Sequence, residues 1–259
     1  MVNIKKGDFT GLAKNYSINR PDYSMSVLNA ILGLSPKPIK NIDFVDVGAG
    51  TGIWTRMVSK KGVKTVTAIE PNEDMLSNGV KDSLNTKINW LKGCAENTTL
   101  KTETVDWVTM ASSFHWVDFN KTLKEFYRIL RPAGRFTALW NPRMIESNPL
   151  LIEIENYLKS ILPTNFKRIS SGRSGITNLL RENLEKSNLF RDIIYIEGTH
   201  TIEMSKKRYL GVWNSVNDIR FQVGEKKFLR FINFIKEKIN NIEIIKAEYQ
   251  TRSWTALKK

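Results

Sequence analysis

The stretch DFVDVGAGTGIW, residues 43–54, decides the fold. It joins a run of apolar and β-branched residues to three glycines at alternate positions, Gly48, Gly50 and Gly52. The pattern predicts a buried strand that ends at Val47, a tight glycine turn, and the start of a helix. Because glycine lacks a Cβ, a turn of this kind lets the backbone approach a bound molecule closely.

The segments that follow alternate between strand-like and helix-like patterns. The first predicted helix is closed by Gly62, the next begins at an Asn72 cap, and a third stops at Pro132. Strands that alternate with helices form a parallel sheet. We therefore predict an α/β fold: a doubly wound, mostly parallel seven-stranded sheet with a helical cap over its carboxyl edge. The predicted strands are residues 42–47, 64–70, 87–93, 106–112, 134–141, 190–204 and 249–258, and later helices are predicted over residues 148–158, 206–220 and 225–239.

The composition limits the class of protein. The chain has 259 residues, a single cysteine and two histidines, which argues against a disulfide framework and against a metal site. No window approaches the about 18 uninterrupted apolar residues of a membrane span, and the charged N-terminus does not resemble a signal peptide. We therefore expect a cytoplasmic protein that contacts no membrane and holds no metal.

The net charge of +14 is the unusual total. It is compatible with a nucleic-acid partner, with an anionic small substrate, or with a solvated basic surface. The lysines are scattered and do not alternate with aromatic residues as a base-stacking surface would. We favour the solvated surface and expect no nucleic-acid partner.

The turn and the second strand together indicate a nucleoside site. Glu70 ends the second predicted strand, where its carboxylate can accept both hydroxyl hydrogens of a ribose. The dinucleotide fingerprint G-x-G-x-x-G would need a glycine in place of Ile53, which disfavours a nicotinamide oxidoreductase. Asp46, just inside the first strand, disfavours a pyrophosphate and suits an ammonium group. S-adenosyl-L-methionine has an ammonium, a ribose and no phosphate, and it fits these features.

The motifs of residues 40–140 resemble those of class I S-adenosylmethionine-dependent methyltransferases. DVGAGTG (46–52) is similar to the first motif of that family and AIEPNEDML (68–76) to the second. GCAEN (93–97) resembles the adenine-binding turn, and ILRPAGRF (129–136) the motif that leads into the fifth strand. Two positions depart from the family pattern: Ala133 stands where glycine is common, and Cys94 where aspartate is frequent.

The resemblance implies which residues hold S-adenosyl-L-methionine. The glycine turn approaches the methionine part, Glu70 the ribose, and the GCAEN turn the adenine, while Tyr16 and Arg20 of an N-terminal cap close over the cofactor carboxylate. The cofactor-binding residues implied are Tyr16, Arg20, Asp46, Gly48, Ala49, Gly50, Glu70, Pro71, Asn72, Met75, Cys94, Ala95, Glu96 and Ser112.

The residues that contact the methyl acceptor are expected at the end of the fourth predicted strand, which has the sequence ASSFHWVD, residues 111–118. It lacks the N/D-P-P-Y-like tetrapeptide of enzymes that methylate exocyclic amines. Together with YSINRPDY (16–23) and LWNPR (139–143), it resembles the small-molecule, trans-aconitate methyltransferase-like group. His115 is the catalytic candidate, as a general base or as an orienting residue. The substrate-binding candidates are Tyr23, Trp116, Trp140, Arg143, Trp213 and Arg220.

These features divide the chain into four parts. Residues 1–40 are expected to cap the cofactor site, 41–141 to form the cofactor-binding core, 142–188 to form the acceptor pocket, and 189–259 to complete the sheet with two helices. The function predicted is methylation of a small anionic or aromatic molecule, on oxygen in preference to nitrogen or carbon. An RNA-binding methyltransferase that uses the basic surface and a non-catalytic cofactor-binding protein stay open as alternatives.

Overall fold

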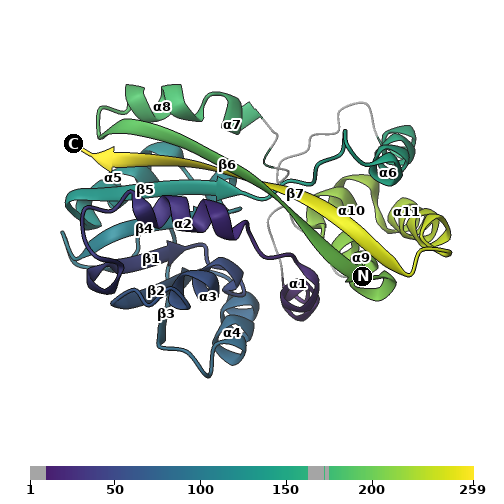
Figure 1. Cartoon of the computed structure of the whole chain (residues 1–259), viewed down its shortest axis with the longest axis horizontal. Coiled ribbons are helices and arrows are strands. Elements are labelled where there is room, and N and C mark those ends of the chain that lie inside the picture. The colour runs from purple at the N-terminus through teal and green to yellow at the C-terminus, as the bar shows by residue number, and fades with distance from the viewer. Residues whose placement is uncertain (1–9, 163–171, 173–174) are drawn as a thin grey trace.

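A seven-stranded sheet forms the centre of the molecule, in the order β3-β2-β1-β4-β5-β7-β6 (Figure 1). The computed structural model describes residues 10–162, 172 and 175–259. Strands β1 to β5 are parallel, whereas β7 pairs antiparallel with both β5 and β6. The predicted doubly wound, mostly parallel sheet is confirmed. Its strands are β1 (Asp43–Val47), β2 (Thr65–Glu70), β3 (Ile88–Lys92), β4 (Val105–Ala111), β5 (Leu130–Trp140), β6 (Phe190–Ser205) and β7 (Ile244–Lys258).

Helices cover both faces of this sheet. On one face the apolar side chains of α2 and α3 pack on β1, β2 and β4 around Phe44 and Trp107. On the other face α5 and α8 pack on β4, β5 and β7 around Phe126 and Phe136. The helices of this part are α1 (Ala13–Asn19), α2 (Met25–Gly33), α3 (Ile53–Ser59), α4 (Glu73–Asp82), α5 (Phe119–Ile129), α7 (Gly175–Asn178) and α8 (Leu180–Lys186), with short 3₁₀ turns η1 (Ile39–Asn41) and η2 (Phe114–Trp116).

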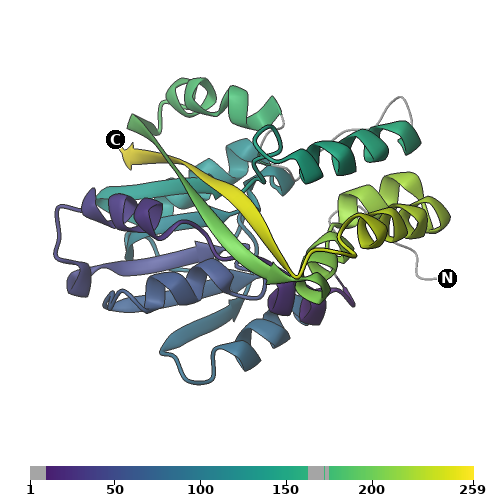
Figure 2. The ribbon, with the colours of Figure 1, turned by 45° about the vertical axis from the view of Figure 1, so that its right-hand side comes forward.

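A separate helical subdomain stands on the far ends of β6 and β7. We use this name for α6 (Pro149–Ile161), α9 (Lys206–Asn214), α10 (Asn217–Val223) and α11 (Glu225–Lys238). The two long strands run out of the sheet as a ribbon, and the helices gather at its end (Figure 2). Their apolar side chains form a third core with Met204, Ile245 and Ala247 of the ribbon. The subdomain therefore faces the carboxyl end of the parallel strands.

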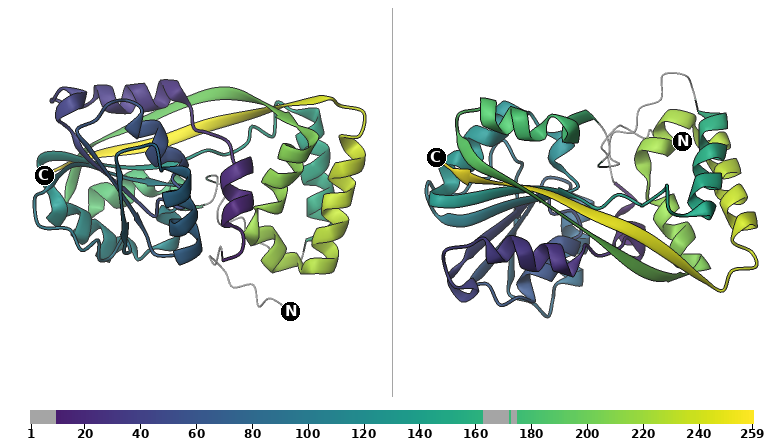
Figure 3. Two further views of the ribbon diagram at one scale, coloured as in Figure 1. Left: turned by 90° about the horizontal axis from the view of Figure 1, so that it is seen from below. Right: turned by 45° about the horizontal axis from the view of Figure 1, so that its top comes forward.

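Helix α1 lies between the sheet and the helical subdomain (Figure 3, left). It is tied to α9 by the Asn15 side chain, which donates to the Gly211 carbonyl at 3.0 Å. It is tied to α4 by a hydrogen bond from Ser17 to Asp82. The expected N-terminal cap thus divides into two parts. Helix α1 lies at the carboxyl end of the sheet, whereas α2 packs on a face of the sheet (Figure 3).

Three further elements differ from their predicted positions. The expected helix over residues 206–220 is two helices, α9 and α10, separated at Ser215 and Val216, and Arg20 donates to the Ser215 carbonyl at 3.2 Å. Strand β7 begins earlier than predicted, since Ile244 pairs with Ser205 of β6. Of the expected 142–188 insertion, only α6 joins the subdomain, while α8 packs on the sheet. The polar stretch SSGRSG, residues 170–175, is typical of a loop in the sequence, and it lies largely outside the described residues. Among the described residues, no helix has both the length and the apolar character that crossing a membrane requires.

The backbone is strained at Ala133, just before β5 begins its continuous pairing with β4 at Arg135, and a substitution can relieve that strain. Ala133 has a φ of 61°, a left-handed conformation that costs a residue with a Cβ about 1 kcal/mol. We expect Ala133→Gly to raise the free energy of unfolding by roughly that amount, and the melting temperature by about 2–4 °C.

The neighbouring glycine provides the opposite variant. A Cβ on Gly134 would lie 2.9 Å from the Arg131 carbonyl oxygen and 3.1 Å from that of Asp106. Gly134→Ala should therefore lower the melting temperature in the same thermal unfolding experiment. A rise for Gly134→Ala, or a fall for Ala133→Gly, would contradict this description of the turn.

Candidate active site

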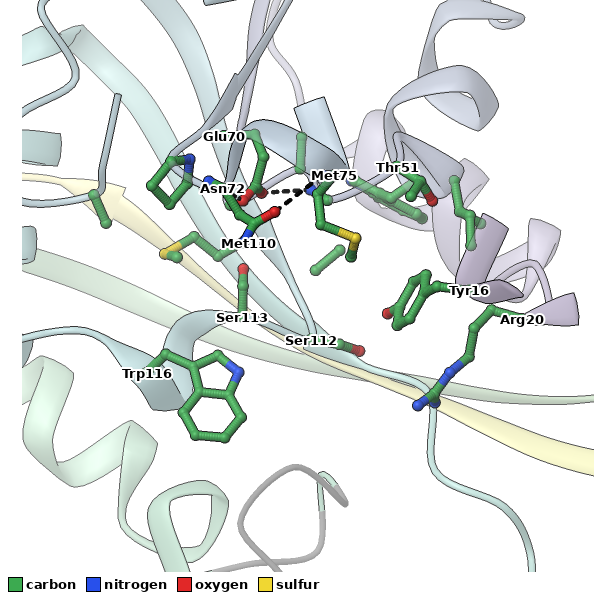
Figure 4. A pocket seen from close by; sticks show the side chains of 18 of the residues that line it. Tyr16, Arg20, Thr51, Glu70, Asn72, Met75, Met110, Ser112, Ser113 and Trp116 are labelled. Carbon is green, nitrogen blue, oxygen red and sulfur yellow. Dashed lines mark hydrogen bonds between the residues drawn. The ribbon is translucent and has the colours of Figure 1, made fainter. Parts of the chain in front are cut away.

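A cavity of about 290 Å³ opens at the carboxyl ends of β1, β2 and β4. Its wall contains the glycine turn, the start of α4, the turn after β3 and the N-terminal α1, so segments far apart in the sequence meet there (Figure 4). The expected cofactor residues that line it are Tyr16, Arg20, Gly48, Ala49, Gly50, Glu70, Pro71, Asn72, Met75, Cys94, Ala95, Glu96 and Ser112. Two expected substrate residues, Tyr23 and Trp116, line it as well.

The carboxylate of Glu70 fixes the wall of the cavity. One oxygen, Oε2, accepts the amide of Gly50 at 2.7 Å, and Oε1 accepts the amide of Asn72 at 2.9 Å. The side chain is 6% exposed. Burial raises the pKa of Glu70, and the two amide donors oppose that rise. Each carboxylate oxygen can accept more than one hydrogen bond, so the group keeps acceptor capacity for a ligand hydroxyl.

The glycine turn approaches the end of β4 too closely for a side chain. Gly48 has a φ of 64°, and a Cβ built on it would lie 2.8 Å from the Ser113 hydroxyl oxygen. That hydroxyl donates to the Val47 carbonyl at 3.2 Å, which joins β4 to the turn. The contact explains in steric terms why a glycine stands here.

Asp46 does not line the cavity, so the structure does not bring it together with the other predicted cofactor residues, and its contact with the cofactor stays a prediction. It is fully buried behind the turn. Thr55 of α3 donates to its Oδ2 at 2.6 Å, and Thr109 of β4 to its Oδ1 at 3.0 Å. The carboxylate thus joins β1 to its neighbours, and burial raises its pKa to about 7.

The N-terminal segment closes one side of the cavity. Arg20 lies 4.8 Å from the centre of the Tyr16 ring, and its Nε donates to the Ser215 hydroxyl at 2.8 Å. The Tyr23 hydroxyl is hydrogen-bonded to that of Ser112 at 2.9 Å, and burial is the main cause that raises the Tyr23 pKa. The cap is therefore bonded both to β4 and to the helical subdomain.

His115 lies behind the cavity wall. Its Nδ1 accepts the indole N–H of Trp140 at 3.1 Å, which places the proton of a neutral ring on Nε2. Neither His115 nor Trp140 lines the cavity, although Trp116, whose ring centre is 4.6 Å from that of His115, does. This geometry supports an orienting role for His115 over that of a general base.

The remaining predicted substrate residues lie in or beside the helical subdomain. Arg143 stacks on Trp213, 3.8 Å from the ring centre. Arg220 is held by Glu225, with its Nε and Nη2 donating at 2.7 and 2.6 Å. Because this pairing uses the guanidinium, the structure does not direct Arg220 to the cavity.

Sequence reasoning overlooked several residues of the wall. Ser113 directly follows the predicted fourth strand and Asn141 is the last residue of the predicted fifth strand, and the position at a strand end was the signal for both. Trp54, on α3, closes the floor and donates to the Thr109 hydroxyl at 3.1 Å. Its place was not visible in the sequence, because a tryptophan at the start of a helix is equally compatible with an ordinary core residue.

The comparisons with known proteins agree with this geometry. The methyltransferase domain family matches residues 45–138. An uncharacterized methyltransferase of Mycobacterium tuberculosis is 33% identical over 128 residues, 49% of this chain and 49% of that protein. The chain thus spans about half the length of the curated relatives it matches.

Solved structures extend the likeness of the fold to nearly the whole chain. A candidate type II methyltransferase from Anaeromyxobacter dehalogenans has a TM-score of 0.63 at 16% identity, over 93% of this chain and 97% of that one. Phosphoethanolamine N-methyltransferase 2 of Haemonchus contortus, solved with phosphomonomethylethanolamine and S-adenosylhomocysteine, has a TM-score of 0.54 at 15% identity, over 96% of this chain and 57% of that one.

Residues 45–138 match the methyltransferase domain family, and the fold of nearly the whole chain is that of solved methyltransferases. S-adenosyl-L-methionine is the cofactor that this similarity implies. The cavity fits that molecule in two respects. The buried Glu70 carboxylate can bind a ribose, and the glycine turn lets the backbone approach a ligand. Position 53 is isoleucine, where a phosphate-binding dinucleotide turn would have a glycine. The narrower trans-aconitate methyltransferase-like group stays a prediction.

Asp46 should make stability depend on pH in a defined window. Its pKa is about 7 in the folded chain against 3.8 as the ordinary value. Between those two values the unfolded chain has lost the proton that the folded chain keeps, so the stability falls as the pH rises. Asp46→Asn, which mimics the protonated group, should gain roughly 2–3 kcal/mol relative to the wild type between pH 5 and pH 8.

Thermal unfolding of both proteins at several pH values measures this difference. Asp22→Asn is the control, because the Asp22 side chain is exposed, and it should keep the wild-type pH profile. An Asp46→Asn profile parallel to that of the wild type would contradict the buried, protonated state of Asp46.

Proposed function

We propose that the protein transfers a methyl group from S-adenosyl-L-methionine to an oxygen of a small anionic or aromatic molecule. The observation that carries the proposal is the Glu70 carboxylate, held by the Gly50 and Asn72 amides at the wall of the cavity. Charge-assisted acceptors of this kind suit the two hydroxyls of a ribose. In this proposal Gly48, Ala49 and Gly50 pass along the methionine part, and Ala95 and Glu96 contact the adenine.

A small acceptor is supported by how the cavity is enclosed. Tyr16, Tyr23 and Trp116 stand around it, and the Asn141 side chain donates to the Asp22 carbonyl at 3.0 Å across its mouth. The sequence also lacks the tetrapeptide that accompanies methylation of base amines. The net charge of +14 is compatible with an anionic acceptor, and a cavity of about 290 Å³ suits a small molecule better than RNA.

The chain's own contribution to the reaction is alignment and exclusion of water. When bound, the cofactor supplies an electrophilic methyl group on a sulfonium. The aromatic faces of Tyr16 and Trp116 favour positive charge nearby, and the walls hold an acceptor in line with the transferred group. An acceptor carboxylate is already ionised at neutral pH and needs no base. His115 orients Trp116 and Trp140 in this proposal.

Replacement of Glu70 tests the cofactor site. Loss of two charge-assisted hydrogen bonds costs about 3 kcal/mol, so Glu70→Ala should weaken S-adenosylhomocysteine binding about a hundredfold by titration calorimetry. Glu73→Ala is the matched control, because Glu73 is an exposed acid at the start of α4, and it should bind as the wild type does. Equal affinity of Glu70→Ala and the wild type would rule out the ribose role.

Replacement of His115 tests the chemistry. A labelled-methyl assay against small acids, phenols, amines and RNA first identifies the acceptor. For an oxygen that needs no base, His115→Gln should lower kcat by less than tenfold, because only orientation is lost. Loss of a general base would lower it by about 10²–10⁴-fold. A drop of that size with unchanged cofactor affinity would reject the orienting role, and methylation of RNA alone would reject the small acceptor.

A further inference from the structure

Arg143 is a half-buried cation whose Nε and Nη2 are enclosed by the fold. It follows β5, forms an isolated bridge with Tyr249 of β7, and stacks on Trp213 of α9 at 3.8 Å. In residues 10–162, 172 and 175–259 it makes no ion pair, and its Nε and Nη2 are buried without a hydrogen-bond partner. The stacked indole holds the guanidinium plane in place from one face.

The groups around Arg143 share this lack of partners. The hydroxyls of Tyr209 and Tyr249 and the indole N–H of Trp213 are buried without a hydrogen bond of good geometry in the described part of the chain. These side chains are 1%, 2% and 0% exposed. Burial is the main cause that raises the pKa of the Tyr209 hydroxyl. The nearby Arg143 cation and the Trp213 indole lower this pKa, whereas Tyr249 and Glu155 raise it. We call Arg143, Tyr209, Trp213 and Tyr249 the arginine cluster.

Such a cluster is costly unless it serves a ligand. A buried donor without a partner costs about 1–3 kcal/mol, and a charged one more. Native proteins therefore keep such groups rare. The two free nitrogens of Arg143, Nε and Nη2, form one edge of the guanidinium, and that edge donates two parallel hydrogen bonds to a carboxylate or a phosphate. The chemistry that satisfies the cluster is an oxyanion.

The arginine cluster lies next to the cofactor cavity along two paths. Asn141, which lines the cavity, continues through Pro142 to Arg143. Ser215, just beyond Trp213, accepts the hydrogen bond of the cavity residue Arg20. Figure 3 shows α9, which carries Tyr209 and Trp213, on the side of α1 that faces away from the sheet. The arginine cluster is thus linked to the cavity wall through residues 141–143 and through the bond from Arg20 to Ser215.

We infer that the arginine cluster holds a non-reacting oxyanion of the methyl acceptor, a carboxylate or a phosphate. The inference rests on the proposed function and names its substrate class. An oxyanion paired with a guanidinium is a poor nucleophile, because its charge is already stabilised. The oxygen that is methylated is therefore a second group, and the acceptor carries at least one anionic anchor besides it.

Matched ligands test this assignment by direct binding. The probes are 4-hydroxybenzoate, 4-hydroxyphenyl phosphate and the neutral 4-hydroxybenzamide, each titrated by calorimetry into protein saturated with S-adenosylhomocysteine. At least one oxyanion should bind the wild type tenfold or more tightly than the amide, and the tighter of the two identifies the anchor group. Arg143→Met should abolish that preference. Arg252→Met is the matched control, since Arg252 also stacks on a tryptophan, Trp254, but donates to Tyr195 at 2.8 Å.

A second variant provides a readout that a structural role would not give. Tyr249→Phe removes a buried hydroxyl that has no partner, so it should leave the melting temperature unchanged or higher while it weakens the oxyanion about tenfold. A Tyr249 hydroxyl needed for packing would instead lower the melting temperature and leave binding unchanged, which would contradict the inference.

The outcomes separate this inference from the proposed function. If S-adenosylhomocysteine binds but the amide and both oxyanions bind equally, or none binds at 10 mM, the inference fails and the cofactor site stands. If Arg143→Met keeps the oxyanion preference, the inference fails as well. If the oxyanions bind through Arg143 while S-adenosylhomocysteine does not bind, the anion site stands and the proposed function fails.

Discussion

The hydrogen bonds of the Glu70 carboxylate to the amides of Gly50 and Asn72 are the constraint around which this site is built. They require the ends of β1 and β2 to lie side by side, which the parallel register from Asp43 with Thr65 to Val47 with Ile69 provides. The Ala49 amide, which donates to the Ile69 carbonyl at 3.1 Å, continues that ladder into the turn. A buried carboxylate is costly without donors, so the position of the turn and the ionisation of Glu70 depend on each other.

The helical subdomain lies at the same end of the sheet as this carboxylate (Figure 1). The ribbon of β6 and β7 leaves the sheet and carries the helical subdomain to its carboxyl end (Figure 1). Arg20 connects the two parts, because it lines the cofactor cavity and donates to Ser215 at the break between α9 and α10. These bonds link the wall of the cofactor cavity to the subdomain that carries Tyr209 and Trp213 of the arginine cluster.

The sequence allowed the sheet and most of the cofactor wall to be predicted, because their signals are local. The glycine turn, the acid at the end of β2 and the Asn72 cap each follow from neighbouring residues and from the geometry of a parallel sheet. Asp46 was grouped with the cavity residues because the sequence does not tell whether the side chain at a strand end faces the ligand or the helix behind the turn. Its partners, Thr55 and Thr109, come from two other elements.

The acceptor side depends on contacts between distant segments, which a single sequence does not display. Arg20 reaches the Ser215 carbonyl from the far end of the chain, and the ring of His115 is oriented by Trp140 from the next strand. The bond of Arg220 to Glu225 is local and could have been predicted, since only a short turn separates the two residues. Tyr209 and Tyr249 carried no motif, and their importance appears only where the fold brings them beside Arg143.

A crystal structure of the protein with S-adenosylhomocysteine tests the central claim most directly. The account predicts that both ribose hydroxyls lie within about 3 Å of the Glu70 carboxylate oxygens, with the bonds from Gly50 and Asn72 still in place. A ribose bound elsewhere in the cavity, or a Glu70 side chain turned away from these two amides, would contradict it.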